Sequence, residues 1–196
     1  GQRVPVFVYT SFDEAELFGK GVSVCTTCDG PFFKGKQVAV YGGGNTAADM
    51  ALEMSGIASV VYLISRSPLK ADAVTIDRLK EKKNVVIETW VVITGLHGDR
   101  ALSAIDTAPR HDPANTTRLA IDGLFLGLGL TPNTAVFAGT VGMNTFGEIL
   151  VDENCRTNVP GLFAAGDATS VESKQLGVTA GDGIKASLAA YAYLRK

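Results

Sequence analysis

Apolar runs that alternate with helical segments organise most of this chain. The runs are short and almost uniformly apolar, as in strands that are buried on both faces of a sheet. The expected strands lie at 36–41, 59–64 and 123–130, strand-like apolar runs occur within 84–93, and the expected helices lie at 45–54, 72–82 and 179–194. Strands alternating with helices predict an α/β fold with a largely parallel sheet.

Shorter segments complete the predicted order of elements. Residues 102–121 are polar and irregular, and we expect a hairpin there whose loop spans 109–116. A capped turn or short helix is expected at 11–15, and short strands are expected at 4–10, 148–151 and 161–165. A change in composition near residue 123 predicts a domain boundary there.

Composition narrows the class of protein. Of the 196 residues, 46% are apolar and 19% are charged, which is typical of a globular protein with a sizeable core. The net charge of −2 argues against nucleic acid or an anionic membrane as the main partner, because both demand a cationic face. No apolar run approaches the ~20 residues of a membrane span, and the first residues lack a signal-peptide pattern. We therefore expect a cytoplasmic protein, in which paired cysteines are more often catalytic or metal-binding than structural.

A glycine-rich turn follows the strand at 36–41. Gly42, Gly44 and Ala47 fit the G-x-G-x-x-G/A pattern between a strand and a helix, a context that gives the pattern meaning. Gly42 allows the tight turn, Gly44 lets the backbone approach a pyrophosphate, and Ala47 keeps the helix close to the strand. Asn45 and Thr46 open the helix, whose N-terminus presents free N–H groups to phosphates. The sequence predicts a dinucleotide site here, and a structural glycine turn without a ligand is the alternative.

Two cations follow the second strand, where the adenine ribose is expected. A carboxylate at this position usually selects NAD, whereas cations select the extra phosphate of NADP. Here Arg66 and Lys70 occur, and no acid appears before Asp72. This pattern favours NADPH over NADH, and the alternative is that both side chains are solvated surface cations.

Two of the three cysteines form the motif Cys25-Thr26-Thr27-Cys28, followed by Asp29. A zinc ribbon needs a second pair of ligands at matching spacing, which the chain lacks, so no metal is expected. A structural thiol pair is a second alternative. A redox-active pair suits a chain with a nucleotide site, and Asp29 can serve as its proton acceptor unless it only forms an Asp-Gly turn. Hydride passes poorly from nicotinamide to a disulfide without a two-electron intermediary, and a flavin is the usual one.

The segment GKGVSVCTTCDGPFFKGKQVAVYGGGNTA resembles the central part of low-molecular-weight thioredoxin reductases and of the related flavoprotein subunit of alkyl hydroperoxide reductase. TNVPGLFAAGDAT resembles the second flavin-binding motif of that family, and KQLGVTAGDGIKASLAAYAYL resembles its closing helix. The resemblance covers roughly residues 12–196. It implies a Rossmann-like NAD(P)H-binding domain at 12–123 that carries the CxxC, and the C-terminal part of an FAD-binding domain at 124–196, with 1–11 a linker or remnant.

The resemblance also implies roles for individual residues. Cys28 would exchange electrons with FAD, Cys25 would attack a protein disulfide, and Asp29 would act as general acid and base. The partner would be a thioredoxin-like or peroxiredoxin-like protein, and the enzyme a homodimer. The residues that would bind FAD are Gly166, Asp167, Lys174, Gln175 and Leu176. Without the resemblance, GLFAAGD is merely a buried strand that ends in an exposed acid.

The chain departs from the family pattern in two places. No G-x-G-x-x-G motif precedes Cys25, so the chain is expected to lack the N-terminal half of the FAD domain. The alternative functions are therefore a nucleotide-binding module without flavin and without turnover, or a fragment of the alkyl hydroperoxide reductase flavoprotein. The family's NADPH-linked members carry two adjacent arginines where this chain has Arg66-Ser67, which leaves NADH open, as in the peroxide-reductase branch. Cys155 is expected to be a spectator, and His97 and His111 are expected to be solvated in polar loops.

Overall fold

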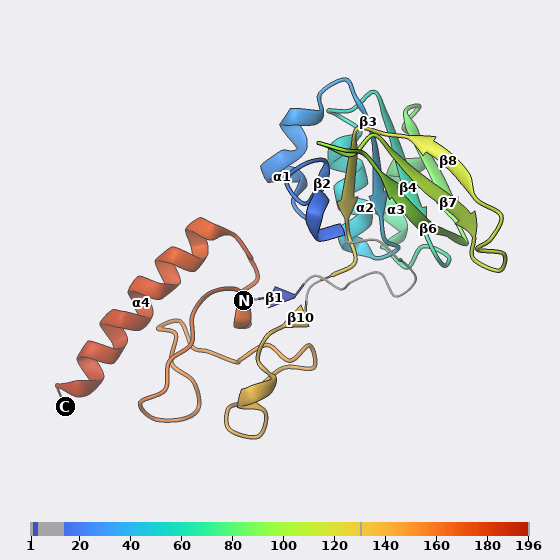
Figure 1. Cartoon of the computed structure of the whole chain (residues 1–196). Helices are drawn as coiled ribbons and strands as arrows, with labels where there is room; N and C mark the ends of the chain where they lie inside the picture. The colour runs from blue at the N-terminus through green and yellow to red at the C-terminus, as the bar shows by residue number, and fades with distance from the viewer. Residues whose placement is uncertain (1, 4–13, 130, 196) are drawn as a thin grey trace. The chain divides into compact units, whose positions relative to one another are not determined.

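A computed structural model describes residues 2–3, 14–129 and 131–195 (Figure 1). The chain forms two compact units. The larger unit spans Val6–Gly129, and the smaller unit combines Gly1–Pro5 with Leu130–Lys196. The expected strand at 4–10 lies outside the described residues.

The larger unit is built on a parallel sheet of five strands in the order β2-β9-β3-β4-β5. The mixed α/β fold with a parallel sheet is therefore confirmed. The central strands β3, β4 and β9 are apolar because both of their faces are covered. The strands are β2 (Val22–Ser23), β3 (Gln37–Tyr41), β4 (Val60–Ser65), β5 (Val85–Thr89) and β9 (Gly123–Leu126).

Two helices, α2 (Asn45–Met54) and α3 (Ala73–Lys80), cover one face of this sheet (Figure 1). The buried side of α2 consists of small residues and Met54, which lets the helix pack closely on the strands. Phe33 closes this core at one side, and its ring packs edge to face on Phe125 with the ring centres 5.3 Å apart. The alanines expected to permit close packing of α2 therefore serve that purpose.

A second, antiparallel sheet comprises β6 (Val91–His97), β7 (Ala104–Pro109) and β8 (Thr117–Ala120). Strands β7 and β8 form the hairpin that the polar segment predicts. In the β6–β7 pair, Val91 lies opposite Pro109 at one end and His97 lies opposite Ala104 at the other. Residues near 91 and 110 therefore share one end of this sheet, away from the turn at 98–103.

The segment before β3 holds the two paired cysteines. It consists of the 3-10 helix η1 (Glu14–Leu17), the strand β2, the short helix α1 (Thr26–Asp29) and the 3-10 helix η2 (Gly30–Phe33). Strand β2 pairs with β9, so it seats this segment at one edge of the parallel sheet.

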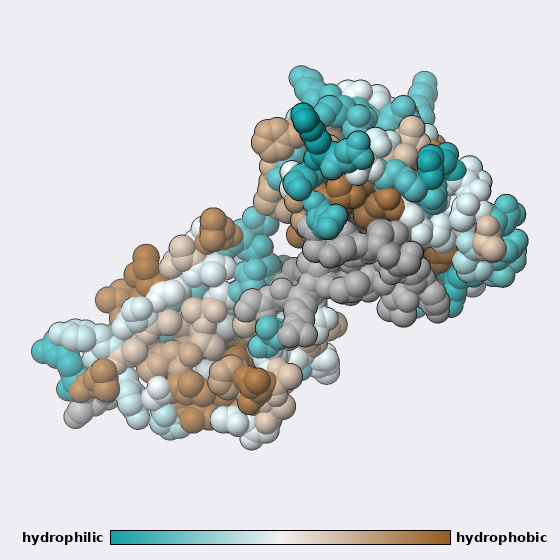
Figure 2. All heavy atoms as spheres, in the orientation of Figure 1, coloured by the Kyte–Doolittle hydropathy of each residue, from teal (hydrophilic) through white to brown (hydrophobic). Residues whose placement is uncertain are grey.

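The smaller unit has little regular structure apart from its last helix. Strand β1 (Gln2–Arg3) pairs with β10 (Thr131–Pro132), and two 3-10 turns follow, η3 (Ala135–Phe137) and η4 (Gly166–Ala168). Helix α4 (Leu176–Leu194) begins three residues earlier than the expected 179. In Figure 2, apolar residues gather on the visible face of this unit.

Three expectations about the second half of the chain need correction. Residues 148–151 and 161–165 form isolated bridges at Ile149 and Phe163 rather than strands, because neither meets a partner strand in the described part of the unit. The 161–165 segment is also half-buried or exposed rather than buried. The two compact units divide after Gly129, later than the boundary expected at 123, because β9 pairs with β3 and β2.

Candidate functional site

The glycine turn between β3 and α2 brings the helix unusually close to the sheet. Gly42 has a φ of 153°, and a Cβ atom there would lie 2.4 Å from the carbonyl oxygen of Gly127. A Cβ atom at Gly127 would lie 2.6 Å from Cα of Ala47. Glycine at 42 and 127 and alanine at 47 are therefore all required for the contact between turn, helix and β9.

The first turn of α2 faces open space. Gly44 is the N-cap residue, its side-chain position has nothing within 4 Å, and no side chain caps the helix. The N–H groups of this turn are thus available to an anion, as at other dinucleotide-binding helices. Asn45 instead ties two elements together, because its Oδ1 accepts the N–H of Asp72 at 2.8 Å and its Nδ2 donates to Asp72 Oδ2 at 3.2 Å.

A cleft of about 320 Å³ lies over this turn. It brings together five of the predicted nucleotide-site residues, while Ala47 lies buried behind the turn and Asn45 does not line the cleft. The backbone N–H of Lys70 donates to the carbonyl of Gly43 at 2.6 Å, which holds the loop after β4 against the glycine turn. The lining residues are Tyr41, Gly42, Gly43, Gly44, Thr46, Ser65, Arg66, Ser67, Lys70, Gly127, Leu128 and Gly129.

Trp90 and Arg110, which no sequence motif singles out, lie at the same end of the fold as Arg66. Arg110 Nη1 donates to the carbonyl of Arg66 at 3.3 Å, and the Arg110 guanidinium lies 5.8 Å from the centre of the Trp90 ring. Trp90 has a φ of 63°, a conformation that bulky residues rarely adopt. A second pocket of about 200 Å³ is lined by both arginines with Val92, Thr94 and Pro113.

The paired cysteines form a disulfide, and their Cα atoms are 5.3 Å apart. Cys28 is exposed and Cys25 is half-buried, and the N–H of Cys28 donates to Cys25 Sγ at 3.1 Å. The Ser23 hydroxyl donates to Asp29 Oδ2 at 2.6 Å and accepts the N–H of Cys25 at 3.0 Å. Ser23, which sequence reasoning missed, therefore connects the Asp29 carboxylate to the cysteine turn.

The cysteine turn rests on the far half of α2. The buried Thr26 hydroxyl donates to Glu53 Oε2 at 2.5 Å, and the position of a Cβ on Gly30 is 3.0 Å from the sulfur of Met54. The disulfide and the glycine turn are thus attached to the two ends of one helix.

The predicted flavin-binding residues all lie in the smaller unit. Gly166 has a φ of 77°, and Thr179 Oγ1 donates to Asp167 Oδ1 at 2.8 Å. Lys174 Nζ lies 2.9 Å from Glu148 Oε1 and also donates to the carbonyl of Thr169. Burial alone would raise the pKa of Glu148, but hydrogen bonds from Lys174 and Asn144 lower it. Gln175 and Leu176 are exposed where α4 begins, and no side chain caps that helix end.

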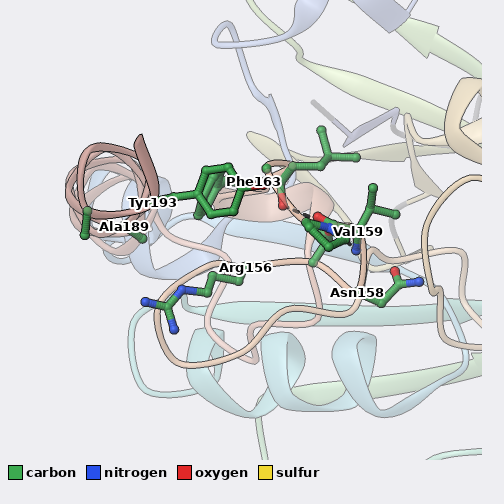
Figure 3. Close-up of a pocket in the computed structure, with 11 residues that line it drawn as sticks. Arg156, Asn158, Val159, Phe163, Ala189 and Tyr193 are labelled. Carbon is green, nitrogen blue, oxygen red and sulfur yellow. Dashed lines mark hydrogen bonds between the residues drawn. The ribbon is translucent and has the colours of Figure 1, made fainter. Parts of the chain in front are cut away.

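A pocket of about 220 Å³ lies between α4 and the 156–163 segment (Figure 3). Its wall includes Phe163 and Tyr193, whose rings pack edge to face with centres 6.2 Å apart. None of the residues predicted to bind a cofactor lines this pocket.

The two histidines and the third cysteine lie in different environments. The expectation for His97 is wrong, because it lies in β6 with Nε2 2.7 Å from Asp106 Oδ2, whereas His111 is exposed in the β7–β8 connection. Hydrogen bonds from Arg118 and His97 lower the pKa of Asp106. Burial raises the pKa of the Cys155 thiol. Among the described residues, no cluster of three metal-ligating side chains occurs, and no helix has the length and apolar character needed to cross a membrane.

Comparison with known proteins identifies the family. The family model described as pyridine nucleotide-disulphide oxidoreductase matches residues 2–183. The chain belongs to this family. It is 42% identical over 185 residues to an alkyl hydroperoxide reductase subunit of Staphylococcus aureus (strain NCTC 8325 / PS 47), covering 92% of this chain and 36% of that protein. It is 43% identical over 177 residues to the corresponding protein of Escherichia coli (strain K12), covering 89% of this chain and 34% of that protein.

Solved structures of thioredoxin reductases share the fold. The Streptococcus pyogenes enzyme superposes with a TM-score of 0.88 at 28% identity, covering all of this chain and 63% of that one. The Giardia duodenalis enzyme gives a TM-score of 0.87 at 30% identity, covering all of this chain and 64% of that one. The chain therefore spans about a third of the length of the curated relatives that it matches. The expected relationship to thioredoxin reductases and to the alkyl hydroperoxide reductase flavoprotein is confirmed.

Proposed function

We propose that this chain is the nucleotide-binding and dithiol-bearing part of an NAD(P)H-dependent flavoprotein that reduces protein disulfides. The observation that carries the proposal is the Cys25–Cys28 disulfide, which lies beside the hydrogen-bonded Asp29 and in the same compact unit as the glycine-turn cleft. A purely structural disulfide would not need an exposed cysteine next to a carboxylate. Family membership and the relatives' names support the same chemistry.

The glycine-turn cleft suits the pyrophosphate of a dinucleotide. Gly44 leaves open space for phosphate oxygens, and the uncapped first turn of α2 supplies N–H donors. Arg66 and Lys70 line the same cleft and favour a ligand with an additional phosphate, so NADPH is proposed ahead of NADH.

The dithiol would transfer electrons to a partner by thiol–disulfide exchange. Two electrons and two protons open the Cys25–Cys28 bond and leave two thiols. The Cys25 thiolate then attacks one sulfur of the partner's disulfide, and the other partner sulfur leaves and takes up a proton. The Cys28 thiolate attacks the mixed disulfide, which restores the Cys25–Cys28 bond and releases the partner as a dithiol. Asp29, held by Ser23, would accept the proton of one cysteine and return it.

The smaller unit offers a place for FAD. When bound, FAD supplies the two-electron relay between a reduced nicotinamide and a disulfide. Its proposed contacts are Gly166, Asp167, Lys174, Gln175 and Leu176. The uncapped start of α4 leaves backbone N–H groups for a phosphate oxygen, and Gly166 adds a left-handed turn before it. The partner would be a thioredoxin-like or peroxiredoxin-like protein, and the enzyme a homodimer.

The proposal is tested by following both sites in the purified oxidised chain. NADPH and NADH are titrated against Trp90, the only tryptophan, whose emission overlaps the absorbance of reduced nicotinamide. The chain is then mixed with FAD and NADPH without oxygen, quenched with an alkylating agent and mapped by mass spectrometry. We expect nucleotide-dependent quenching of Trp90 and alkylation of Cys25 and Cys28 that depends on both cofactors.

Matched variants make the outcome specific. Cys28→Ser should abolish disulfide reduction, Asp29→Asn should slow it by about 100-fold or more, and Cys155→Ser should leave it unchanged. Nucleotide binding without reduction of the disulfide would identify a flavin-free nucleotide-binding module instead. Absence of nucleotide binding would refute the proposal.

A further inference from the structure

Arg110, at the end of a strand of the antiparallel sheet, contacts Arg66, which lines the glycine-turn cleft. Its backbone N–H donates to the carbonyl of Trp90 at 2.7 Å, just after β7 ends, and its guanidinium donates to the carbonyl of Arg66 after β4. Three chain segments that are far apart in sequence therefore meet where the parallel strand β4 ends. This is the edge at which nucleotides bind open α/β sheets.

The Trp90 ring fixes the direction of the Arg110 side chain. The guanidinium lies over the ring at 5.8 Å, within the range of a cation–π interaction. Trp90 is about half exposed and has a left-handed backbone. A strained backbone at a bulky residue persists only where the surroundings enforce it, and such residues cluster at functional sites. The left-handed backbone of Trp90 keeps its ring beside the Arg110 guanidinium, and the ring stays about half exposed.

Arg66 and Arg110 both line the second pocket, which adjoins the glycine-turn cleft at Arg66. Arg66 lines both the glycine-turn cleft and the second pocket, whereas Arg110 lines only the second. Both charges also affect the pKa of Tyr41, in the strand that leads into the glycine turn. Burial raises the pKa of Tyr41, and the positive charges of Arg66 and Arg110 oppose that shift. The two cations therefore face one site of about 200 Å³ whose other walls are Val92, Thr94 and Pro113.

We propose that the pocket between Arg66 and Arg110 binds the adenosine 2′-phosphate end of the dinucleotide, with Arg110 as a specificity-determining residue and Trp90 as its positioning residue. Two guanidinium groups provide the paired donors that a phosphate dianion takes. The apolar walls suit a flat base. This inference rests on the proposed nucleotide site and explains how a chain with a single arginine after β4 would still select a 2′-phosphate.

The test compares adenosine 2′,5′-bisphosphate with adenosine 5′-monophosphate, which differ only in the 2′-phosphate. Calorimetric titration of the whole chain should show tighter binding of the bisphosphate. Arg110→Gln should weaken bisphosphate binding by about 10- to 100-fold, the range that a hydrogen bond between charged groups carries, and change monophosphate binding by less than about twofold. Arg100→Gln removes the same charge in the turn at the opposite end of the β6–β7 pair and should change neither affinity.

Trp90 variants separate positioning from folding. Trp90→Ala should weaken only the bisphosphate, Trp90→Phe should restore its affinity, and thermal unfolding should show both variants folded. Equal affinity of the unaltered chain for the two ligands, or an equal effect of Arg110→Gln on both, would overturn the inference while leaving the nucleotide site intact. If the unaltered chain binds neither ligand, the proposed function itself fails.

Discussion

An added methyl group should destabilise the fold at one glycine of the turn and leave stability almost unchanged at another. Gly42→Ala places a Cβ atom 2.4 Å from the Gly127 carbonyl oxygen and 2.8 Å from Cβ of Ala47, both of which belong to the packed core. The backbone at 42 also has a positive φ that alanine avoids. Overpacking of this kind typically costs about 1–3 kcal/mol, and strain at such a φ adds about 1–3 kcal/mol. Gly42→Ala should therefore unfold the larger unit or strongly destabilise it.

Gly44→Ala should leave stability almost unchanged. The added methyl group meets nothing within 4 Å, and the φ of −96° suits alanine. A compatible Gly→Ala change stabilises by about 0.4–1 kcal/mol through the unfolded chain. Alanine is a poorer N-cap than glycine, which offsets a similar amount. The net change should stay within about 0.5 kcal/mol, or about 2 °C in the melting temperature.

The same methyl group occupies the space proposed for the pyrophosphate. Nucleotide affinity of Gly44→Ala should therefore fall by about tenfold or more, the equivalent of about 1.4 kcal/mol of steric cost. Thermal unfolding followed by circular dichroism measures the first effect, and calorimetric titration with NADPH measures the second. If Gly44→Ala binds NADPH as tightly as the unaltered chain, the phosphates do not approach this turn and the assignment of the cleft is wrong.

Two further outcomes concern pH and thiol reactivity. Because Arg118 and His97 lower the pKa of Asp106 below its usual 3.8, this carboxylate adds stability that is complete above that value and lost as the pH falls further. Asp106→Asn should therefore lower the free energy of unfolding at pH 7 but not near pH 2, as measured in urea, and an equal loss at both values would contradict the ion-pair argument. Because burial raises the pKa of Cys155, iodoacetamide should label this thiol in urea but hardly at all in the folded chain at neutral pH, as measured by mass spectrometry, and rapid labelling of the folded chain would show the thiol to be accessible.

Local sequence patterns predicted the central strand and helix of the larger unit. The run QVAVY, the glycine turn and the alanine-rich helix agree with one another at every level, so β3 and α2 follow almost directly from sequence. The 161–165 segment is just as apolar, yet a strand requires a neighbour, and the described part of the smaller unit gives it only the bridge at Phe163. The apolar character of a segment does not show whether a partner strand lies beside it in the fold.

The residues that the sequence did not reveal are those that topology brings together. Strands β6 and β7 separate Trp90 from Arg110 in the sequence, and helix α3 and strand β5 separate Arg66 from Trp90. No spacing rule therefore connects the three residues. Ser23 is an ordinary residue of a two-residue strand, and only the turn of α1 brings it to Asp29. The sequence likewise does not show that Trp90 has a left-handed backbone, because glycine is the residue that usually indicates this conformation.

Helix α2 joins the disulfide segment to the glycine turn through the Thr26–Glu53 hydrogen bond at its C-terminal half and the Gly42–Ala47 contact at its start. Ten residues thus connect two regions of different chemistry. The amide hydrogens of both regions should exchange with solvent through one shared opening event rather than two, because both regions contact α2. The nucleotide site and the dithiol would then form a single cooperative unit, and a variant that loosens α2 should impair both at once.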